Sequence, residues 1–159
     1  MKSISAYEND SETFIVAEIG QAHDGSLGIL HSLVESIAET GVNAIKFQIH
    51  IADSESSIQE PFRKKFSYVD SSRLEYWKRM ELKLEDWRNI KIKCEQLGVE
   101  FLATPFSNSA VDLLEELKVK RYKIGSGDIT NYLLLEKVSR TKKEIIISSG
   151  LGDIDVIDN

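Results

Sequence analysis

The sequence has little that could cross-link it or anchor it in a membrane. Only one of its 159 residues is cysteine, Cys94, and two are proline. A single cysteine excludes an internal disulfide and a cysteine-rich zinc site, which is typical of a reducing compartment. No apolar run is long enough to span a bilayer, and the polar, acidic residues 1–12 do not resemble a signal peptide. We therefore expect a cytoplasmic protein that does not bind membranes.

Positive charge is also in short supply. Twenty lysines and arginines face 26 aspartates and glutamates, which gives a net charge of -6. Nucleic acids and anionic membranes both require a basic surface, so neither is expected as a partner. An anionic ligand must instead be held by a few well-placed cations.

Apolar runs that indicate strands alternate with apolar stripes at helical spacing. Strands are predicted at 14–20, 44–48, 101–103, 121–124 and 145–147, and helices around 27–38, 74–80, 84–97, 111–117 and 134–138. Trp77 and Trp87 lie on helical stripes and are predicted to be core residues. This alternation calls for a parallel sheet with right-handed crossovers. Residues 51–72 break the pattern and are interpreted as a functional or mobile loop.

Two α/β architectures compete for this element order. A doubly wound sheet often has a glycine-rich fingerprint after its first strand, and residues 20–25 do not match one. Polar residues instead follow each strand, as in a (β/α)8 TIM barrel that builds its site from many loops. A barrel needs eight strands and about 250 residues. The sequence therefore predicts a partial barrel, with about five of the eight strands.

Charged and hydroxyl side chains gather at these strand ends. Lys46 and Lys123 can hold an anion, Thr104, Ser126 and Ser148 offer hydroxyls, and Gly125 and Gly127 allow close backbone approach. Two lysines with hydroxyls suit a small anion that carries both phosphate and carboxylate, and Glu18 could move a proton or orient a sugar hydroxyl. For 121–128 alone, an ordinary turn is an equal alternative.

Five segments together resemble the sialic acid synthase (N-acetylneuraminate synthase) family. They are 17–20 with His23 and Gly25, 46–48, 101–106, 122–128 and 148–150, which extend over nearly the whole chain. The resemblance implies a transferase of carbohydrate and polysaccharide biosynthesis. Such enzymes condense phosphoenolpyruvate with N-acetylmannosamine or a related 2-acetamido sugar, form a nonulosonic acid and release phosphate.

The resemblance also implies a role for each matching residue. The phosphoenolpyruvate positions are Lys46, Thr104, Lys123, Ser126 and Ser148, the sugar positions are Glu18, Gln48 and Asp128, and the catalytic candidates are Glu18 and Asp128. The family uses a divalent metal, manganese or magnesium, to activate the aldehyde. Its histidine ligands are expected beyond Asn159, so we expect no metal ligand in this chain.

The implied organisation is incomplete here. Residues 1–13 are interpreted as an N-terminal extension and 14–159 as the first part of the barrel domain, while the later strands and the antifreeze-like domain of the family homodimer are expected to be absent. Ala22 replaces a family asparagine, which removes a polar contact. His31 and His50 are predicted to be surface residues, and His23 to orient its loop.

Two other hypotheses remain open. The chain could be a truncated, non-catalytic fragment that associates with another chain to bury its open sheet edges. It could also belong to another phosphoenolpyruvate-dependent barrel synthase that acts on a sugar phosphate aldehyde. Acceptor choice is expected to involve residues 51–72.

Overall fold

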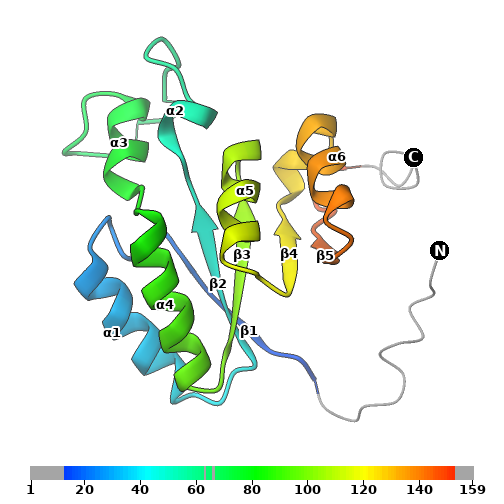
Figure 1. The fold of residues 1–159 in the computed structure, drawn as a ribbon. Helices are drawn as coiled ribbons and strands as arrows, with labels where there is room; N and C mark the ends of the chain where they lie inside the picture. The colour runs from blue at the N-terminus through cyan, green and yellow to red at the C-terminus, as the bar shows by residue number, and fades with distance from the viewer. Residues whose placement is uncertain (1–12, 63, 66, 153–159) are drawn as a thin grey trace.

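A computed structural model describes residues 13–62, 64–65 and 67–152 (Figure 1). Residues 1–12 of the predicted extension lie outside this part of the chain. The strands are β1 (Val16–Gly20), β2 (Ala44–Ile49), β3 (Glu100–Pro105), β4 (Arg121–Ile124) and β5 (Glu144–Ile147). The helices are α1 (Leu27–Ala38), α2 (Ala52–Glu55), α3 (Arg73–Met80), α4 (Leu84–Gln96), α5 (Asn108–Glu116), the 3-10 helix η2 (Ser126–Asp128) and α6 (Tyr132–Arg140).

The five strands form one parallel sheet whose spatial order, β1-β2-β3-β4-β5, follows the sequence. A doubly wound sheet would instead reverse direction at a switch point. Figure 1 shows α1, α4, α5 and α6 on one side of the sheet. Consecutive parallel strands with their crossover helices on a single side form the (β/α)8 arrangement, so the predicted partial barrel of five strands is confirmed.

The hydrophobic core lies between the sheet and these helices. Phe47 stacks on Phe101 with 4.6 Å between ring centroids, and Trp87 packs edge-on against both rings. Alternate strand residues and the inward helix faces complete the cluster, including Ile45, Ile49, Ala103, Tyr122, Ile124, Leu30, Val34, Ile90, Leu114, Leu134 and Val138. Trp87 is therefore the core residue that its helical stripe predicted.

Short polar side chains fix where the helices begin. The hydroxyl of Ser26 accepts from the Ile29 N–H at the start of α1, and that of Ser107 accepts from the Ala110 N–H at the start of α5. Each hydroxyl satisfies a backbone donor that the first turn leaves unpaired. No helix in the described ranges has the length and apolar character needed to cross a membrane.

Arg79 ties the 51–72 insertion to the body of the domain. Its guanidinium binds both carboxylate oxygens of Asp70 and also Asp24 in the β1–α1 loop. Gly25, with φ of +76°, lies against the end of α3, where an added Cβ would come within 2.1 Å of the Arg79 carbonyl oxygen. The insertion is thus held against the carboxyl ends of β1 and β2.

Candidate functional site

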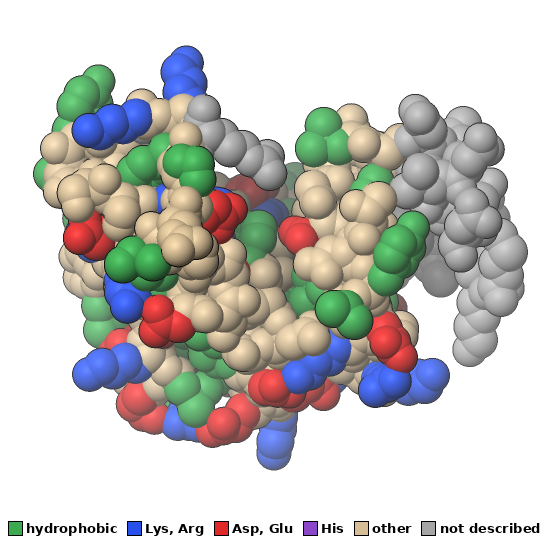
Figure 2. Space-filling view, turned by 90° about the horizontal axis from the view of Figure 1, so that it is seen from above, with side chains coloured by type: hydrophobic (Ala, Val, Ile, Leu, Met, Phe, Trp, Pro, Cys, Tyr) green, Lys and Arg blue, Asp and Glu red, His purple; other side chains and the backbone are tan. Residues whose placement is uncertain are grey.

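We call the sheet face opposite the helices the inner face. Because strand side chains alternate between the two faces, the neighbours of core residues such as Phe47 and Tyr122 point to the inner face. This set contains most of the predicted ligand residues: Glu18, Lys46, Gln48, Thr104, Lys123 and, directly after β5, Ser148. Seen from above in Figure 2, the surface is hollowed between the part that carries α2 and α3 and the part that carries α6, and acidic and basic side chains lie in the hollow.

Lys46 brings a buried positive charge to the inner face. The residue is 7% exposed, and its Nζ lies 2.6 Å from Glu18 Oε1. The side chain of Glu18 is 56% exposed, so its carboxylate can turn toward solvent at little cost. A buried ammonium needs a negative partner, and this one can exchange Glu18 for the anionic group of a ligand.

Lys123 on β4 is the second cation. Its Nζ donates to the hydroxyl of Ser148 and, over 3.0 Å, to the carbonyl oxygen of Ile124. Burial lowers the pKa of Lys123, the charge of Lys46 lowers it further, and Glu18 acts in the opposite direction. The two lysines are therefore close enough to repel each other, and a bound anion would relieve that repulsion.

Thr104 on β3 lies between the two lysine-bearing strands. It is 3% exposed, and its hydroxyl has no hydrogen-bond partner among the residues that the structure describes. In the sheet register it stands beside Gln48 of β2. An unpaired buried hydroxyl costs about 1–3 kcal/mol. The position of this hydroxyl beside two cations indicates that it forms a hydrogen bond with a bound ligand.

Ser126 and Asp128 occupy the turn after β4 rather than the sheet itself. Both are half-buried in η2, and Asp128 Oδ1 accepts from Asn131 Nδ2 over 3.3 Å. Within the described residues, no hydrogen bond or ion pair joins either side chain to Lys46 or Lys123. The structure therefore gathers the predicted strand residues but does not bring these two into contact with them.

The prediction that His50 is a surface residue is wrong. His50 is 4% exposed, and its ring lies between Trp77 and Phe106, with centroid separations of 4.0 and 4.3 Å. The prediction for Trp77 also fails, because this half-buried ring packs on His50 outside the core cluster. The period-two spacing from Lys46 through Gln48 could have placed His50 on the inner side of the strand end.

His50 is the centre of a polar cluster that the sequence reasoning missed. Its Nδ1 lies 2.9 Å from Glu55 Oε2, and its Nε2 lies 2.8 Å from Gln21 Nε2 and 3.3 Å from Gln48 Oε1. Gln21 Oε1 accepts in turn from the hydroxyl of Tyr76. These side chains come from the β1–α1 loop, β2, α2 and α3, so no single sequence motif contains them.

The other histidines agree better with expectation. His23 is buried, and its Nδ1 accepts from the Gly25 N–H over 3.1 Å, which orients the β1–α1 loop as predicted. Burial is the main cause that lowers the pKa of His23. His31 is partly exposed on α1, and Ala22, in place of the family asparagine, is exposed in the loop.

A metal site is not complete in the described ranges. Across residues 13–62, 64–65 and 67–152, no group of three or more His, Cys, Asp and Glu side chains could hold a metal ion. These residues therefore do not fit the divalent-metal site that the resemblance implies, and no step proposed below depends on a metal.

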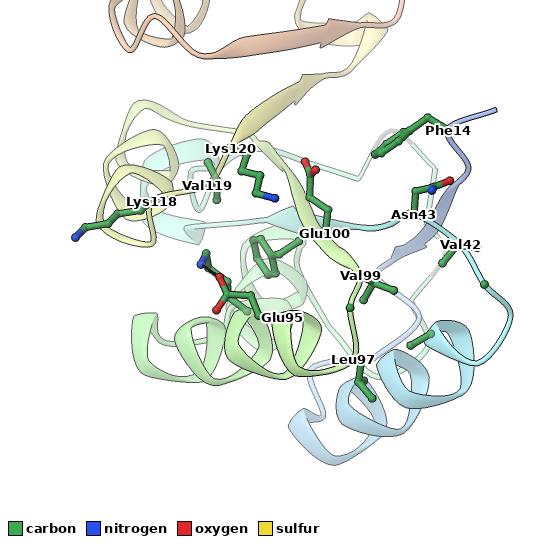
Figure 3. Close-up of a pocket in the computed structure, with 15 residues that line it drawn as sticks. Phe14, Val42, Asn43, Glu95, Leu97, Val99, Glu100, Lys118, Val119 and Lys120 are labelled. Atoms are coloured by element: carbon green, nitrogen blue, oxygen red, sulfur yellow. Dashed lines mark hydrogen bonds and ion pairs between the residues drawn. The ribbon is translucent and has the colours of Figure 1, made fainter. Parts of the chain in front are cut away.

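A second hollow, of about 710 Å³, opens at the opposite end of the strands (Figure 3). Phe14, Asn43, Glu100 and Lys120 are among its lining residues. Glu100 is already paired, because its Oε1 lies 2.8 Å from Arg121 Nε. Barrel enzymes bind their substrates at the carboxyl ends of the strands, so the lysine-bearing end is the better candidate despite this hollow.

Comparison with known proteins identifies the family. Residues 33–159 match the sequence model of the NeuB family. The chain belongs to the NeuB family. It is 35% identical over 150 residues to N,N'-diacetyllegionaminic acid synthase of Campylobacter jejuni, across 92% of this chain and 45% of that protein. It is 31% identical over 147 residues to human N-acetylneuraminate-9-phosphate synthase, across 91% of this chain and 41% of that protein.

A solved structure supports the same family and fold. N-acetylneuraminic acid (sialic acid) synthetase from Leptospira borgpetersenii, in complex with citrate, aligns with a TM-score of 0.78 and 28% identity. The alignment covers 93% of this chain and 48% of that one. The chain thus spans less than half the length of these NeuB family relatives.

Proposed function

We propose that this chain forms the phosphoenolpyruvate-binding part of a NeuB family synthase. The whole enzyme would be a transferase that condenses phosphoenolpyruvate with N-acetylmannosamine or a related 2-acetamido sugar, giving a nonulosonic acid and phosphate. The observation that carries this proposal is that Lys46 and Lys123 lie on the inner face with Thr104, whose buried hydroxyl has no hydrogen-bond partner among the described residues. The citrate complex of the relative from Leptospira borgpetersenii adds support, because citrate, like phosphoenolpyruvate, is a small anion with more than one negative charge.

The donor would occupy the space between the two lysines. Phosphoenolpyruvate carries a phosphate and a carboxylate, and each can take one ammonium group in a charge-assisted hydrogen bond. Thr104 and Ser148 would donate their hydroxyls to the remaining oxygens, and Ser126 would approach from the turn after β4. Lys123 would exchange two neutral acceptors for an anionic one.

The acceptor sugar would lie toward Glu18, Gln48 and Asp128. In the proposed reaction the enol carbon of phosphoenolpyruvate attacks the open-chain aldehyde carbon, and the aldehyde oxygen takes up a proton as the C–C bond forms. Water then adds at the neighbouring carbon, and the C–O bond to phosphate breaks. Glu18, whose exposed carboxylate can turn away from Lys46, and Asp128 are the proposed groups for moving these protons.

Calorimetric titration of the 159-residue chain with phosphoenolpyruvate tests the donor site. Lys123→Ala should weaken binding by about 100-fold, because it removes a charge-assisted contact from a largely buried site. Thr104→Val should weaken it about 10-fold without loss of stability, since the lost hydroxyl has no partner among the residues that the structure describes. Lys120→Ala, which removes an exposed lysine just before β4, should leave binding unchanged. Equal affinity in wild type and Lys123→Ala would overturn the assignment.

The acceptor class needs a separate comparison. In a form of the protein that turns over, phosphate release should depend on a 2-acetamido sugar and not on a sugar phosphate aldehyde such as erythrose 4-phosphate. Release with the phosphorylated aldehyde alone would favour the other phosphoenolpyruvate-dependent barrel synthases.

A second candidate function, association without catalysis, is favoured by β5. Its Ile147 side chain is 51% exposed and Ile145 is 36% exposed, and within the described residues β5 pairs only with β4. Another chain could cover this surface, whether in the homodimer that the resemblance implies or in a complex of fragments. Light scattering after size exclusion tests it: a monomer that releases phosphate would contradict this reading.

A further inference from the structure

We propose that His50 and Glu55 form a positioning pair that keeps the Gln48 carboxamide available to the acceptor sugar. The identity of the sugar rests on the proposed function. The hydrogen-bond chain behind the inference rests on geometry alone and can be tested without a ligand.

Glu55 sets the proton position on His50. The two side chains are 3% and 9% exposed, and Nδ1 of His50 faces both carboxylate oxygens at 3.1 and 2.9 Å. A carboxylate can only accept, so the ring proton is on Nδ1. Because the Gln21 nitrogen that lies 2.8 Å from His50 Nε2 is a donor, Nε2 is the ring nitrogen that carries the lone pair.

Gln21 uses that lone pair. The Tyr76 hydroxyl donates to Gln21 Oε1, which turns Gln21 Nε2 toward the ring. That nitrogen lies 2.8 Å from His50 Nε2 and donates to it. From Tyr76 to Glu55, each of these hydrogen bonds thus joins one donor to one acceptor.

The side chain of Gln48 is not part of this hydrogen-bond chain. Its Oε1 lies 3.3 Å from the same Nε2, which carries no proton and already accepts from Gln21. In the described part of the protein, the side chain of Gln48 makes no other hydrogen bond. Its register neighbour Thr104 also has an unpaired hydroxyl. Two side-by-side polar groups on the inner face are therefore free for a ligand, and Gln48 can accept from a sugar hydroxyl or an acetamido N–H.

Stacking keeps the ring in this orientation. Trp77 and Phe106 lie nearly parallel to His50, with interplanar angles of 21° and 14°. The imidazole cannot tilt toward Gln48 without moving one of these neighbours. The free state of Gln48 is thus built into the packing.

After removal of Glu55, the ring proton of His50 should no longer be held on Nδ1. Without an acceptor at Nδ1, the proton can move to Nε2, which then donates to Gln48 Oε1 and takes it away from the sugar. His50→Phe should have the same outcome by another route. It keeps a ring between Trp77 and Phe106, but it frees the Gln21 amide to donate to Gln48.

The first measurement is nitrogen-15 NMR of the His50 ring in the 159-residue chain without ligand. We expect the Nδ1–H tautomer in wild type and in Glu55→Gln, which keeps an acceptor oxygen, and the Nε2–H tautomer in Glu55→Ala. The matched control is Asp53→Asn, which removes an exposed carboxylate from the same short helix, where its partner is Lys78. An Nε2–H tautomer in wild type would overturn the inference.

The second measurement follows the NMR signals of the Gln48 side-chain amide and of the Lys46 and Lys123 side-chain amines during titration with phosphoenolpyruvate and with N-acetylmannosamine. Glu55→Ala should raise the sugar Kd at least 10-fold and change the phosphoenolpyruvate Kd less than twofold, whereas Glu55→Gln and Asp53→Asn should resemble wild type. If Glu55→Ala does not fold, His50→Phe takes its place. Equal loss of both ligands, or no response of wild-type Gln48 to the sugar, would refute the positioning role. Failure of phosphoenolpyruvate to shift the Lys46 and Lys123 signals would instead refute the proposed function.

Discussion

The two ends of the inner face carry similar residues in opposite states. At the amino ends of the strands, Arg121 lies 2.8 Å from Glu100 and 3.1 Å from Glu144, so its charge is paired twice. At the carboxyl ends, the partners of the Lys123 amine within the described residues are two neutral oxygens, and Lys46 disfavours its charged form. Arg121 and Lys123 lie two residues apart on the same strand and face the same side.

This difference means that the charges at the amino end contribute to stability, whereas those at the carboxyl end serve binding. Paired charges at the amino end satisfy one another and leave nothing for a ligand. The carboxyl end keeps two cations and a buried hydroxyl partly unsatisfied, which costs stability and is typical of a site that a ligand completes. It follows that the carboxyl end must be held together by contacts outside the site.

Gly25→Ala should break the contacts outside the site that hold the carboxyl end together. It should have the largest effect on stability. The new Cβ would come within 2.1 Å of the Arg79 carbonyl oxygen at a φ of +76°, so α3 must move away from the β1–α1 loop. We expect the free energy of unfolding to fall by about 4 kcal/mol in urea titrations.

Gly41→Ala is the matched control for Gly25→Ala. Gly41 has a φ of +80°, but an added Cβ there would meet no atom within 4 Å. Only the backbone penalty of about 1–2 kcal/mol should remain. Equal losses at both positions would mean that α3 does not brace the loop.

Arg121→Met should have the next largest effect, and only on stability. It leaves the carboxylate of Glu100, whose side chain is 11% exposed, without its partner. We expect a loss of about 3 kcal/mol in the free energy of unfolding, with phosphoenolpyruvate affinity unchanged. Glu144→Gln, at the 70% exposed partner, should cost less than about 0.5 kcal/mol. A loss of ligand affinity in Arg121→Met would remove the distinction between the two ends.

The sequence predicted whatever depends on local periodicity. Apolar runs placed the five strands and a helical stripe placed Trp87 in the core, and the polar residues at the strand ends marked Lys46, Thr104 and Lys123 as site candidates. These signals work because each strand or helix buries one face regardless of the rest of the chain.

Features that depend on the 51–72 insertion were not predictable. His50 and Trp77 are exposed or buried according to how that insertion folds back over β2, and its path is set by Arg79 contacts to Asp70 and Asp24. Such long-range ion pairs leave no periodic trace in the sequence. The same holds for the Gln21–His50–Glu55 chain, whose members come from three separate segments.

Lys123→Met should have the smallest effect on the stability of the ligand-free protein. Whether the variant is more or less stable than wild type distinguishes the two ends of the inner face. The folded state lowers the pKa of Lys123, mainly through burial and then through Lys46, so the charged amine opposes folding at neutral pH. That penalty is present below the folded pKa and disappears as pH rises through it toward the unfolded value of about 10.4. Without ligand, Lys123→Met should therefore be at least as stable as wild type at pH 7, within about 1 kcal/mol, and should lose this advantage near pH 10.5. Urea titrations at the two pH values measure the change, with Lys120→Met as the control for removal of an exposed lysine. A variant that is clearly less stable than wild type at pH 7 would show that Lys123 supports the fold as Arg121 does.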